Sequence, residues 1–313
     1  MKLIQESEHI FIKYFLPKMQ EDFSDVLEKA CIGLVGEGSE CFGFDDEISR
    51  DHDSGVGFCI WLDNADYHLH KERLEKFLLN SPAEFNGLPN KFHNPNLWGK
   101  RIGVLSAQNF YAQFLGKPQI PGSWQEWISV PEYFFAVCTN GKLFWEKECL
   151  FASMRKQLLS CYPYEVWLKK MSASCYTIAQ AGQYNAVRAI KRNDYGTLTL
   201  CLAEFCNAII SLLFLLNKQY APFYKWKYTA LKQLPLLGDE AYYALLAINQ
   251  SSSSEQSYPD CIQYMENLCE RIRVIFNEQG LSSIKDNWFM LHAEELQKKI
   301  KTIPLKQYSL LQV

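Results

Sequence analysis

The chain has 313 residues, 48% of them apolar, which is enough to bury one large core or two ordinary ones. Its 35 acidic and 32 basic residues give a formal charge of -3, too balanced for a protein that holds duplex nucleic acid mainly by charge. A nucleic-acid substrate stays compatible with this balance, but the composition does not point to one. The length favours two domains, which we expect at residues 1–150 and 151–313.

The cysteines and the first residues lead us to expect a protein of a reducing compartment. The 11 cysteines include no pair at C-x-x-C spacing, which argues against a zinc knuckle. An odd number of cysteines and a start, MKLIQESEH, that is unlike a signal peptide favour the cytoplasm. The most apolar stretch, 201–216, is interrupted by Glu204 and Asn207 and is short for a bilayer span, so we expect a core helix and no membrane partner.

In chain order, the first half alternates helical and extended patterns. Strands are expected at 32–35, 56–62, 101–105 and 142–145, where short apolar runs occur. Helices are expected over 23–30, over 70–79 and just before Asn140-Gly141, where apolar residues recur at helical spacing or follow a capping pattern.

The second half shows helical periodicity and no convincing strand. Helices are expected at about 152–161, 164–181, 195–218, 225–234, 239–249, 257–279 and 285–300. The serine run 251–254 is typical of a loop between two of these helices. The sequence therefore predicts an α+β first half and an all-α bundle after it.

The most informative stretch for chemistry is GEGSECFGFDDEISRDHDSGVGF, residues 36–58. A strand that ends in Gly36-Glu37-Gly38-Ser39 can turn tightly into a helix, which leaves backbone N–H groups and the Ser39 hydroxyl available to phosphate oxygens. Gly38 and Ser39 are therefore the candidate phosphate-binding residues. A helix N-cap is the simpler reading of Ser39, and it uses the same exposed donors.

Two aspartates precede the second expected strand. On an extended chain the carboxylates of Asp51 and Asp53 project to one face. Two adjacent carboxylates favour a bound cation. Mg²⁺ prefers oxygen ligands and commonly combines one or two carboxylates with substrate phosphates. We expect Arg50 and His52 to support these ligands, and Asp45 and Asp46 to stabilise the turn by local hydrogen bonds.

Gly38-Ser39, eleven residues, then Asp51-His52-Asp53 resembles the core motif of the nucleotidyltransferase superfamily. The longer string GSECFGFDDEISRDHDSG is similar to an uncharacterised bacterial family of that superfamily. Further matches are YNAVRAIKRND at 184–194 and LLNKQYAPFYKW at 215–226.

The resemblance implies an α+β palm with a mixed sheet and a helical domain related to that of aminoglycoside nucleotidyltransferases. It also implies a third metal-binding carboxylate, and the matching position is Glu146, where family members more often carry Asp. Glu148 is the nearest competitor. Related antibiotic nucleotidyltransferases use a carboxylate of the helical domain as general base, and Glu204 is the candidate here; an interhelical hydrogen bond is the alternative for that residue.

Three cations of the second half, Arg188, Arg192 and Lys225, are candidates to neutralise phosphate charge in a cleft between the domains. The function expected is Mg²⁺-dependent transfer of a nucleoside monophosphate from an NTP, with ATP expected, to the hydroxyl of a small acceptor. Two Mg²⁺ ions would serve this reaction. The alternative is a nucleotide-binding or antitoxin-like module of the same fold without turnover. An RNase role for the helical half is disfavoured because no Arg is followed there by His at the expected spacing.

Overall fold

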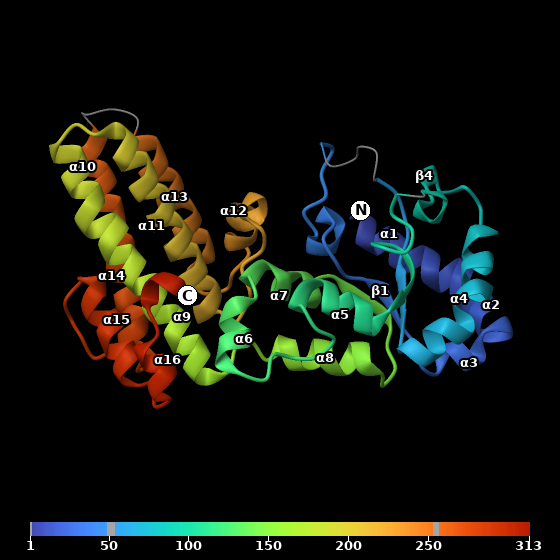
Figure 1. Cartoon of the computed structure of the whole chain (residues 1–313). Coiled ribbons are helices and arrows are strands. Elements are labelled where there is room, and N and C mark those ends of the chain that lie inside the picture. The colour runs from blue at the N-terminus through green and yellow to red at the C-terminus, as the bar shows by residue number, and fades with distance from the viewer. Residues whose placement is uncertain (1, 49–53, 95, 253–256) are drawn as a thin grey trace. The chain divides into compact units, whose positions relative to one another are not determined.

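A computed structural model describes residues 2–48, 54–94, 96–252 and 257–313 of the chain (Figure 1). Its internal contacts divide the chain into two compact units. Unit 1 comprises Met1–Gly122 and Val130–Ser160, and unit 2 comprises Ser123–Ser129 and Cys161–Val313. The predicted fold class is confirmed, because unit 1 contains a mixed sheet among helices and the described part of unit 2 is helical.

A four-stranded sheet is the centre of unit 1. Its strands are β1 (Cys31–Leu34), β2 (Cys59–Leu62), β5 (Gly103–Ser106) and β6 (Lys142–Trp145), in the order β5-β2-β1-β6. β2 pairs with β5 in parallel, whereas β1 pairs antiparallel with both β2 and β6. β1, β2 and β5 are buried along their whole length, which explains their continuous apolar runs.

Helices surround this sheet, and a two-stranded hairpin of β3 (Glu84–Phe85) and β4 (Leu88–Pro89) lies beside them. The helical elements of unit 1 are α1 (Leu3–Ile10), η1 (Phe11–Phe15), α2 (Leu16–Asp22), α3 (Ser24–Leu27), η2 (Ser39–Phe42), α4 (Asn64–Leu79), η3 (Lys91–His93), α5 (Ala107–Leu115), α7 (Glu132–Thr139) and α8 (Leu150–Leu159). The amino-terminal segment supplies much of the core: Phe11 and Phe15 both pack edge-on against Phe58 at about 5 Å between ring centroids.

Helix α8 belongs to unit 1, although the expected domain boundary precedes it. The ring of Phe151 stacks on that of Trp61 in β2, with centroids 4.0 Å apart and planes 17° from parallel. The Tyr111 hydroxyl of α5 donates a hydrogen bond of 2.9 Å to the Phe151 carbonyl. The first unit thus continues to Ser160, and the break at 150 would separate α8 from the strand on which it packs.

Unit 2 is built from α6 (Trp124–Ser129), α9 (Tyr164–Thr177), η4 (Ile178–Ala186), α10 (Val187–Lys191), α11 (Tyr195–Leu216), η5 (Tyr224–Trp226), α12 (Lys227–Leu231), α13 (Gly238–Ser251), α14 (Tyr258–Glu278), α15 (Phe289–Lys298), α16 (Ile303–Gln307) and η7 (Leu310–Gln312). These largely confirm the expected helices. The helix expected over 164–181 runs on as the π-helix η4, and the last expected helix begins at Phe289 rather than at 285.

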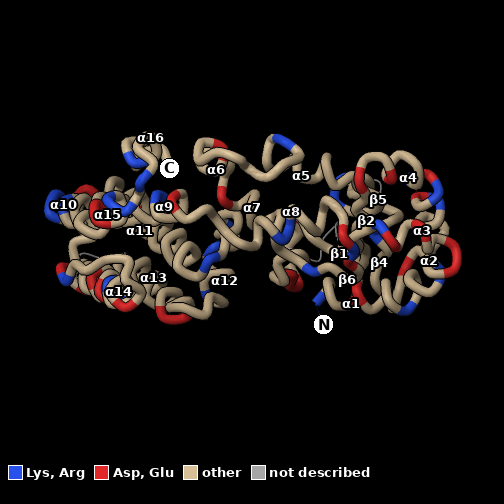
Figure 2. Tube along the Cα trace, turned by 90° about the horizontal axis from the view of Figure 1, so that it is seen from below, with Lys and Arg blue, Asp and Glu red and all other residues tan. Residues whose placement is uncertain are grey.

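Helix α11 is the core helix of unit 2. By length and composition it could cross a bilayer, but 67% of its most apolar window is buried inside the protein. Its packing against α9 and η4 therefore accounts for its apolar sequence, as expected for a core helix. Elsewhere, acidic and basic residues are interspersed along the elements of each unit (Figure 2).

Candidate functional site

The segment that follows β1 forms a tight turn at the position where the sequence predicts phosphate binding. Gly36 has φ +147°, and its N–H and C=O both bond to the side chain of Asn140, at 3.0 and 2.7 Å. Ser39 then begins the short 3₁₀ helix η2, with Gly38 as its N-cap. Gly43, at φ +68°, ends it. The turn is thus as expected, but the helix after it is a single turn.

A buried ion pair that the sequence did not reveal fixes this turn. The ammonium of Lys91 lies 2.6 Å from a carboxylate oxygen of Glu40, and both side chains are at least nine-tenths buried. Arg101 lies 3.9 Å from the same oxygen. A Cβ on Gly38 would lie 2.5 Å from the Glu40 carboxylate, so any other residue there would displace this carboxylate from its present position. No local pattern marks the pair, because its two members are 51 residues apart.

The charge state of Glu40 follows from this packing. Burial alone would raise the pKa of Glu40, but the positive charge of Lys91 and its hydrogen bond outweigh burial, and the pKa is lowered below its ordinary value of 4.5. Glu40 is therefore an ionised partner of Lys91 and is already neutralised. It is not a spare carboxylate for a metal.

Lys91 also ties the turn to the chain that enters β2. Its backbone N–H donates to the Val56 carbonyl at 2.8 Å, and the Val56 N–H donates to the Pro89 carbonyl at 2.9 Å. Gly55 has φ +145°, and a Cβ there would collide with the Pro89 carbonyl oxygen. The segment 89–91 thus holds both the turn after β1 and the approach to β2.

The proposed metal ligands Asp51 and Asp53, with their neighbours Arg50 and His52, lie outside the described residues. The sheet register nevertheless gives the direction of the chain on either side of them. Gly33 pairs with Cys59 and Cys31 with Trp61. The chain therefore leaves β1 and enters β2 at one end of the sheet, the end that carries Gly38 and Ser39.

Glu146 lies at the other end. In the antiparallel pair of β1 and β6, Lys142 is opposite Leu34 and Trp145 is opposite Ile32. Glu146 follows Trp145 and is exposed beside the start of β1, whereas the Gly38-Ser39 turn follows its end. The register does not bring Glu146 to that turn, and its competitor Glu148 continues the same exposed segment. The spacing along the chain could not reveal this, because it does not give the direction of the strand.

Asp45 also differs from expectation. Among the described residues its carboxylate accepts no hydrogen bond from its own turn; it is buried and accepts one of 3.1 Å from the Leu3 N–H, and Lys2 lies 3.9 Å away. It therefore anchors α1. Among the described residues, no group of three or more His, Cys, Asp or Glu side chains could hold a metal ion. The roles of Asp51 and Asp53 as metal ligands thus stay predictions from the sequence.

The candidates of the helical half lie on exposed parts of unit 2. The guanidinium of Arg188 bonds to the Tyr184 hydroxyl at 2.6 Å, and Arg192 caps α10. Lys225 lies in η5, and its ammonium is 5.2 Å from the Trp226 ring centroid. Glu204 is exposed on α11.

These cations do not form one cluster. Arg192 lies before the start of α11, whereas Lys227, two residues from Lys225, bonds to Asn207 far along the same helix, at 3.1 Å. The twelve residue steps from Tyr195 to Asn207 span about 18 Å at the rise of an α-helix. The separation of α10 and α12 is visible in Figures 1 and 2.

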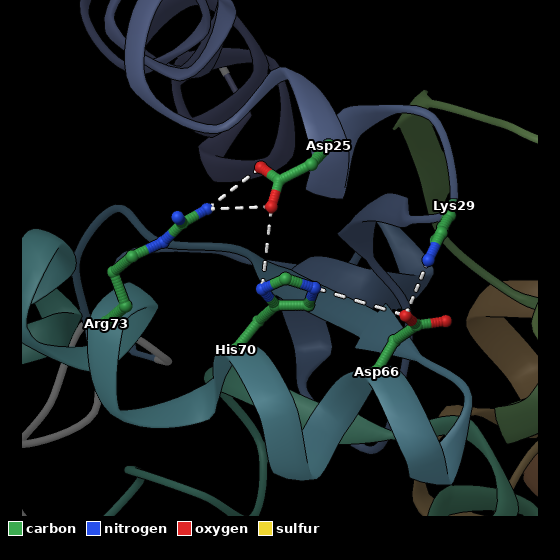
Figure 3. Close-up of polar contacts among 5 residues, drawn as sticks. All are labelled: Asp25, Lys29, Asp66, His70 and Arg73. Carbon is green, nitrogen blue, oxygen red and sulfur yellow. Dashed lines mark hydrogen bonds and ion pairs between the residues drawn. The ribbon is translucent and has the colours of Figure 1, made fainter.

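A second group of charged residues connects α3 and α4 (Figure 3). His70 lies between two carboxylates, 3.7 Å from Asp25 and 4.0 Å from Asp66. Each carboxylate is engaged more closely by a cation, Asp25 by Arg73 and Asp66 by Lys29, both at 2.8 Å. These exposed pairs fasten α4 to the segment before β1.

Residues 127–227, less than half of the chain, match a family described as a domain of unknown function (DUF4037). No curated protein matches the chain. A solved structure of a nucleotidyltransferase-like protein from Exiguobacterium sibiricum is similar over 85% of this chain and 78% of that chain, with 10% identity and a TM-score of 0.35. At this TM-score the likeness carries no argument about the site.

Proposed function

We propose that the chain is a Mg²⁺-dependent nucleotidyltransferase. It transfers a nucleoside monophosphate from an NTP, with ATP expected, to an acceptor hydroxyl and releases pyrophosphate. Gly38 and Ser39 would bind the phosphates, and Asp51 and Asp53 would hold Mg²⁺, two ions in the full site. The expected acceptor is a small molecule.

One observation carries the proposal. The antiparallel pairing of β1 and β2 puts the Gly38-Ser39 turn and the chain that enters β2 at one end of the sheet. Asp51 and Asp53 precede that entry by a few residues. A turn that binds phosphate and a pair of carboxylates at the same end of the sheet would together position a metal-bound triphosphate. The buried pair of Glu40 and Lys91 supports it further, because this pair stiffens the turn.

Calorimetry with Mg²⁺-ATP, and α-labelled triphosphates incubated with a small-molecule extract, test this proposal. We expect the wild-type protein to bind and to form a labelled product. The double variant Asp51→Asn/Asp53→Asn should lose at least about tenfold in affinity, which corresponds to about 1.4 kcal/mol. Glu148→Gln, which removes an exposed carboxylate at the other end of the sheet, is the matched control and should behave as wild type. Failure of all four Mg²⁺-NTPs to bind and to label a product would reject the proposal.

The second candidate is a nucleotide-binding module without turnover, and the position of Glu146 favours it. The register of β1 and β6 puts Glu146 at the end of β1 opposite the Gly38-Ser39 turn, so Glu146 does not act as a third ligand beside that turn. Binding of Mg²⁺-ATP by the wild type with no labelled product from any acceptor would support the module. If a product forms, Glu146→Gln should keep its rate within about threefold, because a side chain remote from the phosphates contributes little to their transfer.

A further inference from the structure

Two cysteines meet at the end of the sheet that the proposed function does not use. Cys31 is the first residue of β1, and Cys149 precedes α8, four residues after the end of β6. Because β1 and β6 are antiparallel neighbours, the start of one and the end of the other lie together. The two sulfur atoms are 3.3 Å apart. A disulfide bond of about 2.05 Å therefore needs an approach of little more than about 1 Å.

The two thiols differ in accessibility. All 11 cysteines belong to the described residues, and ten of them are buried; Cys149 is the exception, with intermediate exposure. Cys31 is fully buried behind it. A solvent-borne oxidant thus meets Cys149 first, and Cys31 is the thiol within reach of whatever forms there.

The two thiols also differ in acidity. The hydrogen bond between the two sulfur atoms, together with the backbone N–H groups of Ala152 and Phe151 at the start of the ten-residue helix α8, lowers the pKa of Cys149 below its ordinary value. Burial and the nearby carboxylate of Asp63 act in the opposite sense but are outweighed. The pKa of Cys31 is raised, first by its hydrogen bond to Cys149 and then by burial. Both influences favour the thiolate at Cys149, which is also the more accessible of the two.

We propose that Cys149 and Cys31 are a reversible disulfide site, in which Cys149 reacts with a peroxide and Cys31 resolves the product. The Cys149 thiolate attacks one oxygen of hydrogen peroxide, the O–O bond breaks, and the leaving hydroxide takes a proton to become water. The Cys31 sulfur then attacks the sulfur of the Cys149 sulfenic acid. The S–O bond breaks, the second water leaves with the Cys31 proton, and two thiols have been oxidised while one peroxide has been reduced.

The cross-link would tie the start of β1 to the start of α8 and close the exposed segment Glu146–Glu148 between β6 and α8 into a fixed loop. It would also restrict the unfolded chain, because it joins residues far apart in sequence. The oxidised protein should therefore melt at a higher temperature than the reduced protein. This site does not depend on the proposed transferase activity.

The test uses the full chain, reduced and then freed of reductant. It is treated with one to ten equivalents of hydrogen peroxide, alkylated and digested with trypsin without reductant. We expect a disulfide between the tryptic peptides 30–50 and 148–155 in most molecules, and its loss on addition of dithiothreitol. Absence of this link in folded, peroxide-treated protein would overturn the proposal.

Variants separate the roles of the two thiols. In Cys31→Ser the sulfenic acid should persist, so dimedone should label peptide 148–155 several-fold more than in the wild type. Cys149→Ser should give neither link nor label on Cys31. Cys41→Ser is the matched control, because Cys41 is a buried cysteine of the same tryptic peptide as Cys31; this variant should keep the link. Preferential labelling of another cysteine, in variants shown to be folded by circular dichroism, would contradict the assignment.

Discussion

At the scale of single residues, the most consequential feature is a charge pair buried under the Gly38-Ser39 turn. Lys91 and Glu40 lie 2.6 Å apart with almost no exposure to water. Burial of these two charges is tolerated because each is the ion-pair partner of the other. Removal of one charge leaves the other buried without its closest partner. The stability of unit 1 and the shape of its turn therefore depend on the same contact.

Lys91→Met should destabilise unit 1 by about 3–5 kcal/mol, because the buried Glu40 carboxylate loses its closest cation and keeps only the more distant Arg101, 3.9 Å away. The double variant Lys91→Met/Glu40→Gln should recover part of this loss, since it removes both charges. Urea unfolding of the purified proteins measures both free energies. Lys29→Met, which breaks an exposed pair with Asp66, is the control and should cost less than about 1 kcal/mol. Equal losses for the buried and the exposed pair would contradict this account.

The same pair predicts a pH dependence. The folded-state pKa of Glu40 lies below 4.5, so the unfolded chain takes up the proton first as the pH falls. The contribution of Glu40 to stability is therefore fully present above about pH 4.5 and is lost as the pH falls through the folded-state pKa. Between pH 5 and pH 3 the free energy of unfolding should fall more steeply for the wild type than for Glu40→Gln. Glu148→Gln, an exposed control, should keep the wild-type slope.

At the scale of elements, unit 1 depends on the close approach of β1 and β6, and unit 2 on the burial of α11. Gly33 faces the backbone of β6 so closely that a Cβ would strike the Lys142 carbonyl oxygen and lie 2.8 Å from the Leu143 Cα. In α11, Phe205 is fully buried and fills the space left by Gly182 of η4. In both places a small residue lets two elements pack at short range.

Gly33→Ala should destabilise unit 1 by at least about 3 kcal/mol, because β6 can make room only by moving its backbone. Thermal unfolding followed by circular dichroism measures the effect. Gly116→Ala is the control: its φ of +77° is unfavourable for alanine, but no atom lies within 4 Å of the added Cβ, so the cost should be about 1–2 kcal/mol. A smaller effect at Gly33 than at Gly116 would mean that β6 is not held where the register places it.

Phe205→Ala should cost unit 2 about 3–5 kcal/mol, since a fully buried ring is replaced by a cavity. Its neighbour Glu204 is exposed, and Glu204→Gln should leave stability unchanged within about 0.5 kcal/mol. Chemical denaturation of the two variants compares them directly. If Glu204→Gln also left product formation unchanged, Glu204 would not be the general base.

At the scale of the whole molecule, the units are not two consecutive halves of the chain. Ser123–Ser129 belongs to unit 2, although the chain before and after it belongs to unit 1. The Trp127 ring of this segment packs 5.7 Å from that of Tyr162. In the other direction, α8 extends unit 1 to Ser160. A fragment that ends at residue 150 therefore lacks part of unit 1.

A fragment of residues 1–160 should melt cooperatively, whereas a fragment of residues 1–150 should not. The shorter fragment lacks Phe151, which stacks on Trp61, and so exposes a strand that is buried in the whole chain. Loss of near-ultraviolet circular dichroism and binding of a hydrophobic dye should mark it as loosely packed. The full chain serves as the reference. Identical melting of the two fragments would show that α8 is dispensable for unit 1.

The sequence by itself determined the types and approximate positions of most elements. Apolar runs predicted β1, β2, β5 and β6, and helical spacing predicted most helices of unit 2. Both are visible in the sequence because the side-chain periods of a strand (2 residues) and a helix (3.6 residues) are local properties of the chain. It also pointed to Gly36, Gly38 and Ser39 as a tight turn, because glycine at such positions has a local steric cause. The aspartates of the motif remain a prediction from the sequence.

Only the tertiary structure decided which residues meet. The direction of β6 places Glu146 at the end of the sheet away from the Gly38-Ser39 turn. The fold also pairs Lys91 with Glu40, and it places Cys149, just after β6, beside Cys31. Each of these contacts joins residues at least 51 positions apart or depends on the direction in which a strand runs. The physical reason is that the free energy of such contacts comes from burial and pairing in the folded core, which the local sequence does not encode.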